Sequence, residues 1–233
     1  MKRLLLISTS TVYGTRYLEH AYDEITSMLG SIARVLFVPY ALKDRDAYTV
    51  KARTAFGEMG YELASIHEVP DAVKAIKNAE AIFVGGGNTF RLLKTLYDAQ
   101  LLEPIRARVL EGMPYSGASA GSNIACPTIR TTNDMPIVEP PSLDALNLVP
   151  FQINPHYVDP DPSSTHMGET REIRINEFHE ENTTPVVGLR EGAMLRVEDH
   201  RVQLRGRASA RIFRRAQAAV DVPPGSDLDE YLL

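Results

Sequence analysis

The chain contains the sequence Gly117-Ala118-Ser119-Ala120-Gly121, which has the pattern G-x-S-x-G. This pattern places a serine in a sharp turn between a strand and a helix, with its hydroxyl exposed at the end of a sheet. The short apolar segment 113–116 precedes it, and residues 121–126 can open a helix that Pro127 stops. The context favours such an elbow, with Ser119 as a candidate nucleophile. The alternative is a turn of small residues where a helix packs closely on a sheet.

Apolar runs alternate with helical patterns before this elbow. The apolar runs predict buried strands at residues 4–7, 35–38, 62–66 and 81–84. The helical patterns predict helices at residues 17–29, 44–59, 72–77, 89–96 and 102–111. This alternation predicts an α/β fold with a mostly parallel sheet and helices on both faces. Ligands bind such a sheet beyond the carboxyl ends of its strands, where residues 85–88 and the elbow both lie.

The pattern changes after the elbow. Residues 127–150 hold five of the fifteen prolines, which predicts a long irregular excursion with a short strand at 135–138. Further elements are predicted as a strand at 151–153, a helix at 169–180 and strands at 186–189, 193–197, 201–204 and 210–213. The last four strands suit antiparallel additions at a sheet edge. We expect one catalytic domain over residues 1–215 and a loosely held tail over residues 216–233.

Composition limits the classes of partner. The formal net charge of −5 gives no overall reason to bind nucleic acid or anionic lipid. The apolar run at residues 4–7 is too short for a secretory signal or a membrane span, so we expect a cytoplasmic protein without a membrane partner. Cys126 is the only cysteine, which excludes an internal disulfide and the multi-cysteine zinc patterns. It directly precedes a proline, and we interpret it as a buried, inert thiol.

A serine nucleophile needs a base, and the base needs a third group that orients it. His156 follows a predicted strand in Asn154-Pro155-His156, where the proline restricts the loop. It is the candidate base, with an ordinary loop histidine as the alternative. Glu191 follows another predicted strand and is the candidate acid, with an exposed turn glutamate as the alternative. An α/β-hydrolase places its acid before its histidine, so the order Ser, His, Glu indicates a different fold with the same elbow.

The glycine-rich stretch Gly85-Gly86-Gly87-Asn88 allows a ligand to approach the backbone closely. The amides of Gly86 and Gly87, together with that of Ala120, predict an oxyanion hole. A phosphate cradle is the competing interpretation. It is disfavoured because the chain lacks Gly-Lys-Ser/Thr here and does not complete G-x-G-x-x-G.

A metal site was also weighed. His156, Asp159, Asp161 and His166 lie within eleven residues, but two prolines interrupt them and H-E-x-x-H is absent. We interpret the cluster as a solvated loop and predict neither a metal nor a cofactor.

Five stretches together resemble the peptidase E family of aspartyl dipeptidases. They are residues 85–89, 117–123, 126–138, 154–156 and 168–171. The resemblance runs from Leu4 to about Phe213, and the run around Asn133-Asp134 is its most specific part. It implies a sheet like that of class I glutamine amidotransferases and a serine peptidase that cleaves dipeptides with an N-terminal aspartate. By position it implies Ser119 as nucleophile, His156 as base and Glu191 as the third member of the triad.

The resemblance also points to substrate contacts. Arg171 lies in one of the matching stretches, and its planar guanidinium suits the aspartate side chain. Asp134 is a candidate for the free amino group, and Asn88 and Thr132 for further polar contacts. The expected partner is a small Asp-X peptide, bound by a monomer or a homodimer. Two alternatives stay open: a cyanophycinase-like enzyme acting on β-aspartyl links, and a catalytically silent binding protein with the same fold.

Overall fold

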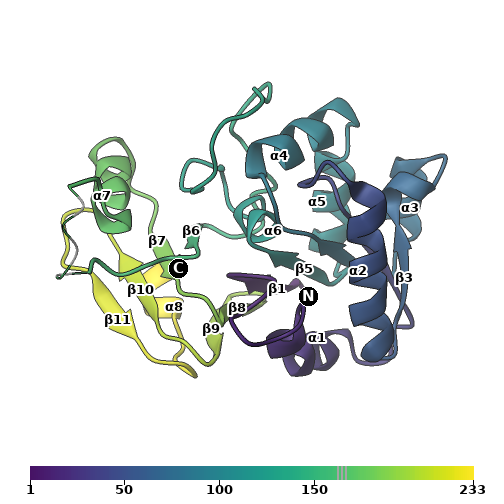
Figure 1. Ribbon diagram of the computed structural model, residues 1–233, viewed down its shortest axis with the longest axis horizontal. Coiled ribbons are helices and arrows are strands. Elements are labelled where there is room, and N and C mark those ends of the chain that lie inside the picture. Colours follow the sequence, from purple (N-terminus) through teal and green to yellow (C-terminus); the bar gives the residue numbers. More distant parts are fainter. Residues whose placement is uncertain (162, 164, 166) are drawn as a thin grey trace.

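The computed structural model describes residues 1–161, 163, 165 and 167–233 (Figure 1). Its larger sheet has seven strands in the order β3-β2-β4-β5-β1-β8-β9. Five strands run parallel, namely β1 (Arg3–Ile7), β2 (Arg34–Val38), β3 (Glu62–Ser65), β4 (Ile82–Val84) and β5 (Tyr115–Ala118). Two antiparallel strands, β8 (Ala193–Glu198) and β9 (Arg201–Gly206), extend the sheet beyond β1.

Helices cover both faces of this sheet because both faces of its strands are apolar. One face packs against α1 (Tyr22–Leu29), which follows the 3-10 turn η1 (Glu19–Ala21), and against α2 (Arg45–Glu58). The other face packs against α3 (Ala72–Asn78), α4 (Thr89–Asp98) and α5 (Leu102–Leu110); a second 3-10 turn, η2 (Ile66–Glu68), precedes α3. In β2, Phe37 joins the first core and its neighbour Leu36 the second. The predicted parallel sheet with helices on both faces is confirmed.

A smaller sheet lies at the opposite end of the molecule from β3 and α3 (Figure 1). Its strand order is β11 (Val220–Val222), β10 (Ala210–Phe213), β7 (Val186–Leu189) and β6 (Gln152–Pro155). The pair β6 and β7 is parallel, whereas β10 is antiparallel to both of its neighbours. Helix α7 (Arg171–Glu181) buries Ile175 against this sheet. The antiparallel strands predicted near the C-terminus are confirmed, divided between the two sheets.

The strand predicted at residues 135–138 does not form. These residues pair with no strand in the described part of the chain, and their backbone makes a local turn in which the Ile137 amide donates to the Met135 carbonyl. Pro136 has no amide to donate to a ladder. The side chains of Met135 and Ile137 are exposed, so no burial favours pairing. The prediction was wrong because alternating apolar residues do not suffice without a neighbouring strand.

The last residues of the chain are packed rather than loosely held. Strand β11 pairs with β10 of the smaller sheet, and the Leu204 amide of β9 donates to the Ser226 carbonyl. The short helix α8 (Asp229–Leu232) follows, and Leu228 and Leu232 are buried in the core. The tail therefore contacts both sheets. Among the described residues, no helix combines the length and apolar composition needed to cross a bilayer.

Candidate active site

Ser119 occupies a sharp turn between β5 and the helix α6 (Ala120–Asn123). Its backbone has φ 52° and ψ −108°, a conformation that L-residues rarely adopt and that proteins retain mostly at functional sites. The turn is fixed on both sides, since the Ser119 amide donates to the Ile7 carbonyl and the Ser119 carbonyl accepts from Ser122 and Asn123. The helix predicted at residues 121–126 begins one residue earlier and ends at Asn123.

Both glycines of the pattern are required by packing. A Cβ on Gly117 would collide with the carbonyl oxygen of Gly121, and a Cβ on Gly121 would collide with that of Val84. Helix α6 thus lies directly against the carboxyl ends of β4 and β5. The close packing that we set as the alternative to an elbow is present together with the elbow geometry.

His156 brings a second element to Ser119. It follows β6, and its Nε2 lies 3.0 Å from Ser119 Oγ. Its Nδ1 lies 2.7 Å from Oε1 of Glu191, which follows β7. The three predicted residues therefore form one hydrogen-bonded chain, from hydroxyl to imidazole to carboxylate. This is the arrangement in which a base can accept the serine proton while a carboxylate fixes its tautomer.

Ser8 holds the backbone of His156, and the sequence analysis did not single it out. Its buried hydroxyl donates to the Leu189 carbonyl at 2.6 Å and accepts from the His156 amide at 3.0 Å. This bond supports a histidine whose φ is 51°, in the left-handed region. Ser8 follows directly after β1, so its position at a strand end was the available signal.

We expect Ser8→Ala to lower kcat by about tenfold to a hundredfold with little change in KM, because it removes a buried bond that positions the base. Thermal unfolding should also occur at a lower temperature, since the Leu189 carbonyl loses its donor. Ser65→Ala is the matched control: Ser65 is buried and hydrogen-bonded to Thr49, but lies at the end of the distant strand β3. It should lower stability and leave kcat near the wild-type value. A similar loss of kcat in both variants would contradict the positioning role of Ser8.

Arg190 holds the segment that follows His156, and it too was missed. Its guanidinium donates to both carboxylate oxygens of Asp159, to Asp221 at 2.7 Å and to Ser209 at 2.9 Å. The hydrogen bond from Arg190 lowers the pKa of Asp159 against the opposing effect of burial. Since Asp221 belongs to β11, the final segment of the chain is linked to the loop that follows His156. No local pattern predicts this pairing, because its partners lie far apart along the chain.

Of the three predicted oxyanion donors, Ala120 follows Ser119 directly and Gly86 packs against it, whereas Gly87 packs against Ala41 and Leu42. Ala120 is the first residue of α6, so its amide has no acceptor within the helix. Gly87 has φ 135°, and its amide has no hydrogen-bond acceptor among the described residues. Gly86 lies so close that a Cβ there would be 3.1 Å from the Cβ of Ser119. Burial raises the pKa of Tyr48 against the opposing effect of its hydrogen bond with Tyr17.

The predicted substrate contacts Asn88, Thr132 and Asp134 meet at the start of α4. Asn88 caps this helix by accepting from the Arg91 amide, and its Nδ2 donates to the Met135 carbonyl at 2.9 Å. Asp134 Oδ2 accepts from the amide and the hydroxyl of Thr89, and Thr132 Oγ1 lies 3.0 Å from the same hydroxyl. These bonds fasten the proline-rich excursion to α4. Among the described residues, none of the three side chains is hydrogen-bonded to Ser119 or His156.

Arg171 is the first residue of α7, whose start is capped by the hydroxyl of Thr170. It lines a hollow of about 380 Å³ together with Val158, Glu169 and Arg174. Burial and the charge of Arg174 lower the pKa of Arg171. Val158, which also lines this hollow, lies two residues after His156 along the chain. No hydrogen bond joins it to the triad among the described residues.

The residues weighed as a metal cluster have other contacts. Asp159 is bound by Arg190, and Asp161 accepts from the amide and hydroxyl of Ser163. His166 lies outside the described residues. Within the part of the chain that is described, no three His, Cys, Asp or Glu side chains are grouped to hold a metal ion. Cys126 is buried, and burial raises its pKa to about 12, which keeps the thiol protonated at neutral pH.

Comparison with known proteins gives consistent matches over the whole chain. Residues 4–205 match the model of peptidase family S51. A protein named Peptidase E from Streptomyces coelicolor is 56% identical over 229 residues, which cover 98% of this chain and 94% of that protein. A protein named "Probable alpha-aspartyl dipeptidase" from Drosophila melanogaster is 48% identical over 230 residues, covering 97% of this chain and 96% of that protein.

A solved structure shares the fold. The crystal structure of a peptidase from an acI-B1 Actinobacterium has a TM-score of 0.72, and the match covers 97% of this chain and 96% of that chain. The sequence identity is 17%, so this likeness concerns the arrangement of the elements alone.

Proposed function

The chain belongs to peptidase family S51, and from this membership we propose that it hydrolyses dipeptides with an N-terminal aspartate, with Ser119 as the nucleophile. The resemblance to peptidase E that the sequence indicated is confirmed by relatives at 56% and 48% identity over nearly the full length. The observation that supports this proposal is the pair of hydrogen bonds that join Ser119 to His156 and His156 to Glu191. A silent binding protein would not need a strained serine aligned with a base.

The proposed reaction is acyl transfer to water. His156 Nε2 takes the proton of Ser119, the serine oxygen bonds to the aspartyl carbonyl carbon, and the carbonyl electrons move onto oxygen. The amides of Gly86, Gly87 and Ala120 hold this oxyanion. His156 returns the proton to the leaving nitrogen as the C–N bond breaks. Water then attacks the acyl carbon with His156 as base again, the bond to the Ser119 oxygen breaks, and His156 returns the proton to that oxygen as the aspartate leaves. Glu191 keeps the proton on Nδ1 throughout.

Arg171 is the proposed partner of the aspartate side chain, because a guanidinium binds a carboxylate through two parallel hydrogen bonds. Asn88, Thr132 and Asp134 are proposed to act on substrate from the excursion that they hold against α4. The peptide substrate follows from the peptidase family. The cytoplasmic location, the single catalytic domain over residues 1–215, the absence of a cofactor and the monomeric or dimeric state stay predictions.

The test of the proposed function is a substrate panel with the purified protein in EDTA. We expect release of leucine from Asp-Leu, with kcat/KM at least about a hundredfold above that for Asn-Leu, because the uncharged side chain leaves the half-buried guanidinium of Arg171 without its charged partner. β-Asp-Arg should be cleaved poorly. Efficient cleavage of β-Asp-Arg with none of Asp-Leu would instead support the cyanophycinase-like alternative, and cleavage of neither would support the binding protein.

A further inference from the structure

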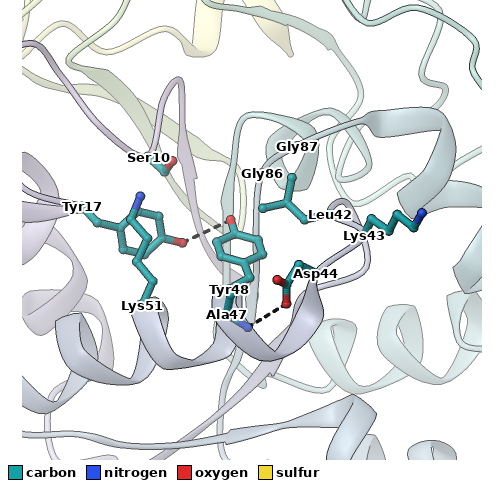
Figure 2. A pocket seen from close by; sticks show the side chains of 10 residues that line it. All are labelled: Ser10, Tyr17, Leu42, Lys43, Asp44, Ala47, Tyr48, Lys51, Gly86 and Gly87. Atoms are coloured by element: carbon teal, nitrogen blue, oxygen red, sulfur yellow. Dashed lines mark hydrogen bonds between the residues drawn. The ribbon is translucent and has the colours of Figure 1, made fainter.

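A second hollow adjoins Ser119 on the side of α2. It has a volume of about 530 Å³ and lies between the loop after β1, the start of α2 and the glycine loop after β4 (Figure 2). Gly86 and Gly87 form one wall of it. Since Gly86 is packed against the Cβ of Ser119, the hollow begins directly beside the proposed oxyanion site.

A buried pair of tyrosines faces this hollow. Tyr17 and Tyr48 are 7% and 6% exposed, both line the hollow, and their hydroxyl oxygens are 3.2 Å apart (Figure 2). The pair carries two hydroxyl protons and makes one hydrogen bond between them, so one proton lacks an acceptor among the described residues. Burial raises the pKa of both tyrosines, which keeps both hydroxyls protonated. A buried donor without an acceptor requires a ligand or water to satisfy it.

The charge of the hollow favours an anion. The ammonium group of Lys51 lies 4.7 Å from the centre of the Tyr17 ring, and Lys43 lies at the rim (Figure 2). The start of α2 adds the positive end of a helix dipole. The one carboxylate in the lining, Asp44, accepts from the Ala47 amide as the helix cap and so has a partner of its own. The remaining walls are apolar, formed by Leu42, Ala47 and the two tyrosine rings.

We propose that this hollow binds the second residue of the dipeptide, with its free carboxylate at Lys51 and the tyrosine hydroxyls and its side chain on the apolar walls. The inference rests on the proposed function. An Asp-X dipeptide carries two carboxylates: Arg171 is the proposed partner of the side chain, and Lys51 is the partner of the C-terminal carboxylate. Gly86 and Gly87 line the same hollow as Lys51 and the two tyrosines, so the residue that follows an aspartyl carbonyl held at these amides enters this hollow. Longer peptides present an amide there instead of a carboxylate, so the enzyme favours dipeptides with an apolar second residue.

The test compares three substrates, Asp-Leu, Asp-Leu-NH₂ and Asn-Leu, on the wild type and on Lys51→Met, Tyr48→Phe and Arg171→Ala. Lys51→Met should lower kcat/KM for Asp-Leu by about tenfold to a hundredfold and change that for Asp-Leu-NH₂ by less than about twofold, because the amide has no charge to lose. Tyr48→Phe should also lower kcat/KM for Asp-Leu more than that for Asp-Leu-NH₂. Arg171→Ala should instead lower kcat/KM for Asp-Leu and leave that for Asn-Leu unchanged. Lys74→Met, an exposed lysine on α3, is the matched control and should keep wild-type kinetics.

The outcomes separate the two proposals. Equal losses of Lys51→Met on Asp-Leu and Asp-Leu-NH₂ would overturn this subsite and leave the dipeptidase activity standing. If Lys51→Met lowers kcat/KM for Asp-Leu and Asp-Leu-NH₂ but not for Asn-Leu, then Lys51 binds the aspartate side chain. That result would overturn the assignment of Lys51 to the C-terminal carboxylate. A wild type that cleaves none of the three would contradict the proposed function itself. Thermal unfolding of each variant confirms that the comparison is made on folded protein.

Discussion

Ser119→Ala is expected to lower kcat/KM for Asp-Leu by about 10⁴-fold or more, because among the described residues Ser119 is the only side chain that is hydrogen-bonded to His156 Nε2. The thiol of Cys126 is buried and remains protonated at neutral pH, so it does not substitute for the hydroxyl. The variant should fold, since the Ser119 side chain does not cap α6 and its hydrogen bond is to His156. The free energy of unfolding should therefore change by no more than about 1 kcal/mol.

Two measurements make this prediction specific to a triad. A covalent probe that reacts with activated serines should label the wild type and not Ser119→Ala. The double variant Ser119→Ala/His156→Ala should be about as slow as Ser119→Ala alone, because residues that act as one unit lose their function together. Turnover that persists in folded Ser119→Ala, or losses that multiply in the double variant, would mean that another group attacks the carbonyl.

The parallel half of the fold could be predicted because its strands are buried on both faces. Leu36 and Phe37 face opposite cores, yet both are buried, so β2 is one continuous apolar run of the kind that marks a covered strand. Pairing near the C-terminus could not be predicted in the same way. Strand β8 joins β1 from the other end of the chain, and β7 joins a separate sheet, although both are short strands of similar composition. Partner choice depends on contacts that no local pattern encodes.

In the candidate site, too, some residues could be predicted from local patterns and others could not. Ser119 lies in a local motif, and His156 and Glu191 each follow a predicted strand, so their types and positions indicated a meeting at one edge. Ser8 and Arg190 act through contacts with distant residues and belong to no motif. Nothing in the sequence distinguishes three residues of the hollow from other positions of a predicted helix: Tyr17, Tyr48 and Lys51. The fold brings them to the same hollow as Gly86. Supporting residues are therefore less visible in a sequence than the groups that react.

Gly86→Ala is expected to lower kcat for Asp-Leu by about a hundredfold to a thousandfold with a much smaller change in KM. The added Cβ would lie 3.0 Å from the carbonyl oxygen of Ala118 and 3.1 Å from the Cβ of Ser119, which is tighter than ordinary contact. Neither neighbour is the end of a flexible side chain, so the elbow or the glycine loop must shift. The shift moves the nucleophile relative to His156 and to the oxyanion donors together. Steady-state kinetics and thermal unfolding would measure the two consequences.

Gly57→Ala is the matched control, because a Cβ on this glycine of α2 meets nothing within 4 Å. Alanine is the better helix former, so this variant should keep wild-type kinetics and gain up to about 1 kcal/mol of stability. If Gly86→Ala folds and has the same kcat as Gly57→Ala, then Gly86 neither positions Ser119 nor donates to the oxyanion. If kcat falls while the melting temperature stays within a few degrees of wild type, the loss comes from the reacting geometry and not from the fold. Because the same glycine forms a wall of the α2 hollow, that geometry also sets where the second residue of the substrate can enter.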